Sequence, residues 1–447
     1  MDDTPLPQSE AVPDKLPLVA AEASAHEVLE EAGFDTDRLA VSTMGTALKG
    51  LQSDQVAPEF KRAGFAAIVW LLLQAFKVSD ISLNPWISAF IDLSIGLVII
   101  QVACQSIIAG TERLAARFNW DHYVAATWSE ILSTLPEIVV VAFLVTVNPY
   151  LAFVTVMLTI YNNALVFSCY SYFLPKDYRG KYLMPKPITE AGTQILVAGG
   201  VLGLIMGFVI VGVRVTKEQV EGFNNNDLIF IACLLLLLFV IYLYRLTVYY
   251  ANEEESIKAA LGKRSLKFRL DLIELYRAVQ RRSWAMIIAL FAIGIVGSLI
   301  GGACVTDFAE IMTQELEVGA FLTAFLLAAF GGMSEYVILW NAHRKKDYGI
   351  ALANAFGGMT QVLFLILPFT LIFGSIAGMS AVAENQGYWL SFTTTSILLF
   401  SFLFPTFYTL TALLEEDHTF DLLDTAVMVA IVLILIYLLM SYGNGVH

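Results

Sequence analysis

Two glutamates, Glu137 and Glu335, each lie inside a long apolar stretch and are 198 residues apart. A carboxylate within a bilayer is energetically costly, and such residues usually mark an ion or proton pathway. Two of them at matching places in two halves of a chain indicate a cation site where the halves meet. The alternative is an interhelical hydrogen-bonded pair with a purely structural role. The common offset and the matching neighbours favour the cation site.

The residues just before Glu137 predict a local break in its helix. Pro136 has no amide hydrogen and interrupts the helical ladder, which frees backbone carbonyls near Ser133 to face an ion. Ser133 and Thr134 add hydroxyl oxygens. In the second half Gly331 and Gly332 take these two places, and exposed backbone replaces the hydroxyls.

Amide and hydroxyl side chains follow both glutamates at one spacing, 25 and 26 residues: Asn162 and Asn163 in the first half, Thr360 and Gln361 in the second. With a rise of about 1.5 Å per residue and a turn between the helices, carboxylate and amides reach similar depths in a core about 30 Å thick. The donor atoms are oxygens, without Cys or His, which suits a hard cation such as Ca²⁺.

Two further polar residues are secondary candidates. Glu130 lies seven residues before Glu137, which places it two turns away on the same helix face at ~10 Å. It is either a second ion or proton site or a residue that faces a water-filled vestibule. Asn354 either lines the ion path or forms a hydrogen bond between helices.

Composition indicates a multi-pass helical membrane protein. The 447-residue chain is 57% hydrophobic and 15% charged, with a mean hydropathy of +0.70. Several apolar runs exceed the length that a helix needs to cross a bilayer, and they lack the alternation of barrel strands. Eleven segments are predicted, at about 64–78, 87–110, 122–147, 150–174, 191–213, 228–249, 284–303, 319–341, 349–375, 388–413 and 425–442.

The last ten segments divide into five plus five at the same 198-residue offset. An odd number of spans in each half means that the halves insert in opposite senses, an architecture that recurs in secondary transporters. The predicted fold class is an all-α polytopic membrane protein, with a ten-helix core of two inverted five-helix repeats plus one extra N-terminal span.

Charge predicts the orientation and the domain limits. Basic residues gather in loops on the N-terminal side of the first span, so we expect a multi-pass protein of the cell membrane with its N-terminus in the cytoplasm. The linker between the repeats either lies on anionic lipid or senses Ca²⁺. The predicted regions are an acidic cytoplasmic extension (1–62), the extra membrane segment (63–86), repeat 1 (87–249), the cytoplasmic linker (250–283) and repeat 2 (284–447).

Other function classes find little support in the sequence. The chain has no broad basic domain, which argues against a nucleic-acid partner. It also lacks HExxH, a Ser-centred elbow and a phosphate loop, so we expect no enzyme. The four cysteines have no CxxC spacing, and no bound cofactor is expected.

Short motifs around both glutamates resemble those of the Ca²⁺/cation antiporter superfamily. "STLPEIV", residues 133–139, is similar to the family signature "TSLPELV". "GGMSEYV", followed by "AFGGMTQVLFLILPF", resembles the second repeat of Ca²⁺/H⁺ exchangers, with its patterns GNAAEH and IGSSTQIALFVIPF. The chain departs from the family in having bulky Ile160 and Tyr161 where small residues are usual, and Gly332 in place of a polar Asn.

The resemblance implies a ten-helix core with Glu137 and Glu335 as the central Ca²⁺ ligands. It implies assisting ligands from both repeats: Ser133, Thr134, Asn162, Asn163, Ser334, Thr360 and Gln361. The function expected is alternating-access exchange of Ca²⁺ for H⁺ across the bilayer. Na⁺ as the counter-ion is the alternative, and a passive cation channel that uses the same glutamates is a second one.

Overall fold

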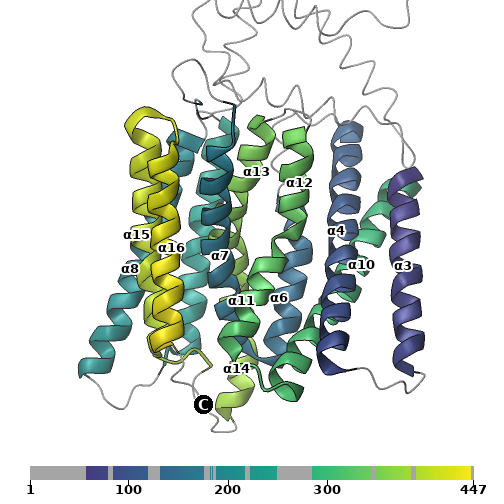
Figure 1. Ribbon diagram of the computed structural model, residues 1–447, viewed down its shortest axis with the longest axis horizontal. Coiled ribbons are helices and arrows are strands. Elements are labelled where there is room, and N and C mark those ends of the chain that lie inside the picture. Colours follow the sequence, from purple (N-terminus) through teal and green to yellow (C-terminus); the bar gives the residue numbers. More distant parts are fainter. Residues whose placement is uncertain are drawn as a thin grey trace, which may run out of the picture.

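The computed structural model describes residues 57–78, 84–118, 131–175, 182, 184, 188–216, 222–248, 284–344, 348–383 and 389–443. These residues form a bundle of roughly parallel and antiparallel helices (Figure 1). Most of the predicted extension 1–62 and all of the predicted linker 250–283 lie outside the described residues. The proposed domain limits therefore stay predictions.

In chain order the described helices are α3 (Ala57–Val78), α4 (Pro85–Phe118), α6 (Leu135–Val147), α7 (Pro149–Tyr172), α8 (Thr193–Thr216), the helix Asn225–Val248, α10 (Trp284–Glu310), α11 (Ala320–Gly331), α12 (Met333–Arg344), α13 (Tyr348–Gln361), α14 (Leu367–Ala383), α15 (Thr394–Asp417) and α16 (Leu422–Tyr442). Three short π-helical stretches join or extend them: η2 (Ile188–Gly192), η3 (Ile311–Glu315) and η4 (Val362–Ile366).

Each apolar segment predicted from the sequence is helical where it is described. Eight helices of the described part are long and apolar enough to cross a membrane, and two shorter apolar helices, Ile131–Val147 and Ala320–Gly331, coincide with the third and eighth predicted segments. β pairing within the described ranges is an isolated bridge between Gly222 and Ser391. The predicted all-α polytopic fold class is confirmed, while the count of ten core helices stays a prediction.

Two helical segments are interrupted at positions that the 198-residue offset relates. The first turns at Thr134, where Pro136 stands at the start of α6, and the second turns at Gly332, between α11 and α12. Pro136 lacks the amide hydrogen that an unbroken helix would need. A Cβ on Gly332 would lie 2.9 Å from the Tyr336 hydroxyl oxygen, so only glycine leaves room for that side chain at the break. As a result, α6 and α12 both begin inside the bundle.

Helices that correspond in the two repeats pack against each other in pairs. The most extensive pairs are α4 with α10 and α8 with α15, which the offset relates. Close approach depends on small residues, as is usual for helices in membranes. A Cβ on Gly301 of α10 would lie 3.0 Å from the carbonyl oxygen of Gly96 on α4. Gly203 of α8 makes a comparably close contact with α15.

Burial separates central from peripheral helices. In the most apolar 18-residue stretch of each helix, the share of buried residues is 78% for α7 and 72% for the segment Asn354–Gly378. The corresponding shares are only 28% for α16 and 22% for Asn225–Val248. Figure 1 shows α7 in the middle of the bundle, beside α13. The two most buried segments therefore carry the amide and hydroxyl side chains that follow the two glutamates.

The α8–α15 contact predicts an effect of a single methyl group on stability. A Cβ on Gly203 would lie 2.6 and 2.8 Å from Leu403 side-chain atoms and 2.9 Å from the Phe400 carbonyl oxygen. Because overpacking of this kind costs about 1–3 kcal/mol, Gly203→Ala is expected to lower the thermal unfolding midpoint in detergent. Gly212→Ala on the same helix meets no atom within 4 Å and serves as the control. Equal midpoints for the two variants would contradict the close packing.

Candidate cation site

The two helix breaks bring Glu137 and Glu335 together. Glu137 lies in the first turn of α6, and Glu335 lies in the first turn of α12. The two carboxylates interact electrostatically with each other, and both residues are only partly exposed. Each carboxylate also lies at the amino end of a helix, where unpaired amide hydrogens and the helix dipole stabilise negative charge. The arrangement concentrates two acidic groups from opposite repeats in one place.

Asn163 of repeat 1 faces the glutamate of repeat 2. A Cβ on Gly358 would lie 2.6 and 2.8 Å from the two Glu335 carboxylate oxygens and 2.9 Å from the Asn163 amide nitrogen, so these groups crowd around one point. Asn163 is 2% exposed. Its side chain interacts with the Glu335 carboxylate, but neither Nδ2 nor Oδ1 makes a well-aligned hydrogen bond within the described part of the chain. A buried amide that lacks such bonds is costly. The Asn163 side chain therefore fits a site that a further group completes.

Asn162 contacts the helix break of repeat 2. Its amide nitrogen donates a hydrogen bond to the Tyr336 hydroxyl and approaches the Ala328 carbonyl oxygen at 3.5 Å. Tyr336 also interacts electrostatically with Glu335 and Glu137. The asparagine pair of α7 thus lies across the interface between the repeats, against α11 and α12.

The predicted ligands Thr134 and Thr360 are buried, and each hydroxyl is oriented by a carbonyl three residues earlier on the same chain segment. Thr134 donates to the Ile131 carbonyl oxygen at 2.7 Å, and Thr360 donates to the Gly357 carbonyl oxygen at 3.0 Å. A hydroxyl that donates its hydrogen keeps its oxygen lone pairs available for a cation. Both hydroxyl oxygens therefore keep their lone pairs free of these bonds.

The carbonyl of Ser133 already has a partner. The Cys104 thiol donates to this carbonyl oxygen at 3.4 Å, and Cys104 is buried. Cys104 also interacts electrostatically with both Glu137 and Glu335. The break before α6 is thus held by α4, and Ser133 is placed beside the acidic pair.

The remaining predicted residues are placed differently from one another. Gln361 is buried on the same helix as Thr360, and Asn354 donates to the Glu335 backbone carbonyl oxygen at 3.3 Å. That bond between α13 and α12 is what the interhelical interpretation of Asn354 expects. Glu130 lies outside the described residues, and so does the side chain of Ser334.

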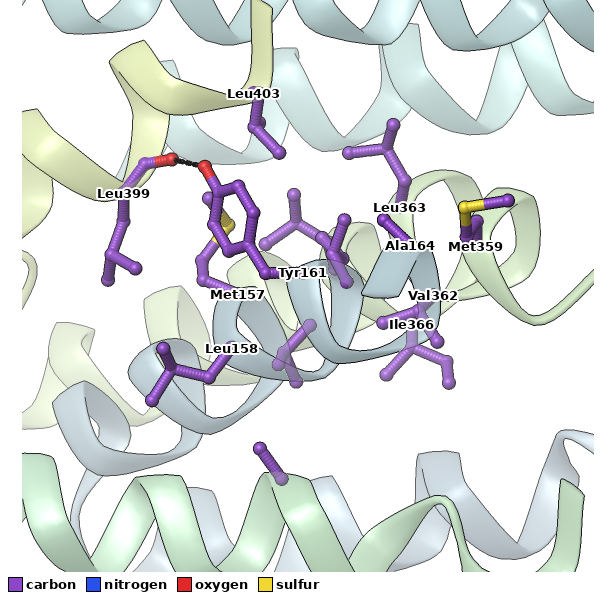
Figure 2. Close-up of a cluster of buried hydrophobic side chains, with 14 of the residues drawn as sticks. Met157, Leu158, Tyr161, Ala164, Met359, Val362, Leu363, Ile366, Leu399 and Leu403 are labelled. Carbon is purple, nitrogen blue, oxygen red and sulfur yellow. Dashed lines mark hydrogen bonds between the residues drawn. The ribbon is translucent and has the colours of Figure 1, made fainter. Parts of the chain in front are cut away.

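The bulky Tyr161, which follows the buried Ile160, does not fill the site. Tyr161 points towards α15 and donates a hydrogen bond to the Leu399 carbonyl oxygen, among Met157, Leu403 and their neighbours (Figure 2). Both residues are at most 1% exposed. Consecutive helical residues point in different directions, so this departure from the family pattern changes the core and leaves the adjacent asparagines facing the acidic pair.

Three residues near the site were not foreseen as site residues. Tyr336 directly follows Glu335, Gly358 has no side chain that could act as a ligand, and Cys104 lies on a helix that carries no predicted ligand. Their places depend on contacts between segments far apart in the sequence. A weak signal existed for Gly358, because its counterpart at the offset is the much larger Ile160.

The available donors define the chemistry of the site. The described residues hold no cluster of three or more His, Cys, Asp or Glu side chains of the kind that binds a resident metal. The acidic pair instead lies beside the Asn163 amide and the Tyr336 hydroxyl, and carboxylate and amide oxygens suit a hard cation. Two carboxylates also balance the charge of one divalent ion or two monovalent ions.

Comparison with known proteins gives a family match over one part of the chain and a shared fold over most of it. Residues 286–444 match the model of the family described as sodium/calcium exchanger protein. The H⁺/Ca²⁺ exchanger CAX has a TM-score of 0.58 at 12% identity, over 86% of this chain and 89% of its own, which shows a common fold. The matched residues lie in the second of the two predicted repeats, and over them the predicted resemblance to the Ca²⁺/cation antiporter superfamily is confirmed.

Two further solved structures are similar to this chain. YfkE has a TM-score of 0.50 at 14% identity, over 83% of this chain and 96% of its own. The sodium-calcium exchanger NCX_Mj has a TM-score of 0.47 at 18% identity, over 78% and 98%. No curated protein sequence matches the chain significantly. The family that residues 286–444 match is described as an exchanger, in agreement with the expectation of a transporter rather than an enzyme.

The crowding at Gly358 predicts a specific loss of cation binding. In Gly358→Ala the new Cβ would meet both Glu335 carboxylate oxygens at under 3 Å, so the carboxylate must move. We expect Ca²⁺ affinity of the purified protein, measured by calorimetry, to fall at least about tenfold, as for other displaced metal-site groups. Gly212→Ala is the control and should bind like the wild type. An affinity within twofold of the wild type would show that the carboxylate position does not matter.

Proposed function

We propose that this antiporter exchanges Ca²⁺ for H⁺ by alternating access. The observation that carries the proposal is the meeting of Glu137 and Glu335 at two helix breaks, beside the buried amide of Asn163. Acidic groups at the midplane interface of two repeats are where transporters of this architecture bind their ions. The similarity to a structure named as an H⁺/Ca²⁺ exchanger supports H⁺ as the counter-ion.

The physical reason for exchange is the cost of unpaired charge. Two carboxylates in a low-dielectric interior cannot both stay ionised and empty, because desolvation and mutual repulsion disfavour that state. When Ca²⁺ leaves, protons must bind the carboxylates before the protein can open the site to the other side of the membrane. Exchange is then obligatory, and leakage of Ca²⁺ alone is suppressed.

The proposed ligands come from both repeats. Glu137 and Glu335 bind Ca²⁺ directly. Amide and hydroxyl oxygens complete the shell, and we assign this role to Ser133, Thr134, Asn162, Asn163, Ser334, Thr360 and Gln361. Glu130 is retained as a candidate second ion or proton site, and Asn354 fixes α13 to the start of α12.

The membrane topology proposed here follows the distribution of basic residues. The protein lies in the cell membrane with its N-terminus and its linker 250–283 in the cytoplasm, because basic loops stay on the cytoplasmic side. The carboxyl end then lies outside.

A second candidate function is exchange of Ca²⁺ for Na⁺. It is favoured by the match of residues 286–444 to the sodium/calcium exchanger family and by the "STLPE" segment before α6. Na⁺ and H⁺ both satisfy the requirement that a positive species fill the acidic pair, so the chemistry of the carboxylates permits either ion.

Gradient-driven uptake separates the candidates. We expect proteoliposomes with an acidic lumen to accumulate ⁴⁵Ca²⁺, and an ionophore that collapses the pH gradient to abolish the uptake. Uptake that requires lumenal Na⁺ at equal pH on both sides would instead establish Na⁺ exchange. Uptake driven by Ca²⁺ alone would indicate a channel. A correctly folded protein without flux under any of these conditions would overturn the proposal.

Substitution of the glutamates tests their role as ligands. Glu137→Gln and Glu335→Gln keep the side-chain size but remove one charge. Because second-shell changes alone cost 10–100-fold in metal affinity, we expect each variant to lose more than about 100-fold in Ca²⁺ transport. Added Ca²⁺ should also no longer raise the unfolding midpoint.

A purely structural pair gives a different pattern. In that case the two variants would unfold at lower temperature and still respond to Ca²⁺ as the wild type does.

A further inference from the structure

The break between α11 and α12 contains a tyrosine that repeat 1 does not have. Tyr336 follows Glu335 directly, while the corresponding position of repeat 1 is Ile138. The hydroxyl of Tyr336 lies over Gly332, where any side chain would collide with it. The ring is therefore accommodated by the same glycine that interrupts the helix.

The Tyr336 hydroxyl binds the amide of Asn162 from the opposite repeat. Asn162 donates through Nδ2 to Tyr336, and the same nitrogen approaches the Ala328 carbonyl oxygen at 3.5 Å. A primary amide has two hydrogens on nitrogen, so both point towards repeat 2. A carbonyl oxygen can only accept, which fixes the nitrogen on this side of the amide.

The oxygen of the same amide is left for another partner. Oδ1 projects from the other side of the planar group, and among the described residues it accepts no hydrogen bond. Asn162 is partly exposed, whereas the adjacent Asn163 is buried. Tyr336 interacts electrostatically with both carboxylates, so the Asn162 amide lies at the edge of the acidic pair.

We propose that Tyr336 is a positioning residue. Together with the Ala328 carbonyl it holds the Asn162 amide nitrogen on repeat 2, which leaves the amide oxygen available to the transported cation. The assignment depends on the proposed function, because it assumes that the acidic pair binds a cation. An amide nitrogen directed at a cation repels it, so orientation decides whether Asn162 helps or hinders binding. The same bond links α7 of repeat 1 to the break in repeat 2.

The first test removes the hydroxyl alone. Tyr336→Phe keeps the ring over Gly332 but removes one of the two acceptors that hold the Asn162 amide nitrogen. We expect the Ca²⁺ dissociation constant and the KM for Ca²⁺ to rise about three- to tenfold, the value of one hydrogen bond, with kcat within about twofold. Tyr150→Phe is the matched control, because it removes a hydroxyl on α7 that pairs with Thr393 outside the acidic pair.

The second test removes the amide that Tyr336 is proposed to hold. In the Asn162→Ala background there is no amide to orient, so adding Tyr336→Phe should change Ca²⁺ affinity by less than about twofold. A structural role of Tyr336 would give the same loss in both backgrounds. The assignment is overturned if Tyr336→Phe binds like the wild type, or if its effect is equally large in the Asn162→Ala background.

Failure of the assignment and failure of the proposed function give different results. A wild-type protein that binds and transports Ca²⁺, together with an unaffected Tyr336→Phe variant, overturns the assignment alone. A folded wild-type protein that neither binds nor transports Ca²⁺ overturns both.

Discussion

Two carboxylates face each other in the interior of a membrane protein, and this electrostatic constraint organises the rest of the structure. Glu137 and Glu335 cannot both remain charged without a positive partner in a low-dielectric environment. The surrounding oxygens lower the cost when a cation is present, and the helix amino ends lower it further. A site of this kind has to be occupied at every stage of a transport cycle, which is the basis of coupled exchange.

The helix breaks leave backbone amide hydrogens free near the two carboxylates. Continuous helices would direct every amide hydrogen along the ladder and leave none for the acidic groups. Interruption at Thr134 and Gly332 starts α6 and α12 within the bundle and places a glutamate in the first turn of each. The pairs α4–α10 and α8–α15 pack closely through glycine, so the two repeats form a firm frame around these starts.

The repeats are related but not equivalent around the site. Gly358 leaves space for the Glu335 carboxylate, while the corresponding Ile160 is a buried core residue. Tyr336 replaces an aliphatic residue and binds Asn162 across the interface. The two asparagines of α7 thus contact Glu335 and Tyr336 of the other repeat. Such asymmetry permits the two halves to contribute different ligands to one ion.

The sequence by itself determined the class of the protein, the helical segments and the acidic pair. Apolar length, the 198-residue offset and the rarity of membrane carboxylates are local or periodic signals, and they can be read without coordinates. Only the tertiary structure decided which side chains meet: Asn163 with Glu335, Asn162 with Tyr336 across 174 residues, and Cys104 with the Ser133 carbonyl. Those contacts depend on how the two repeats pack, because spacing along one helix fixes a face and a depth but not the partner opposite.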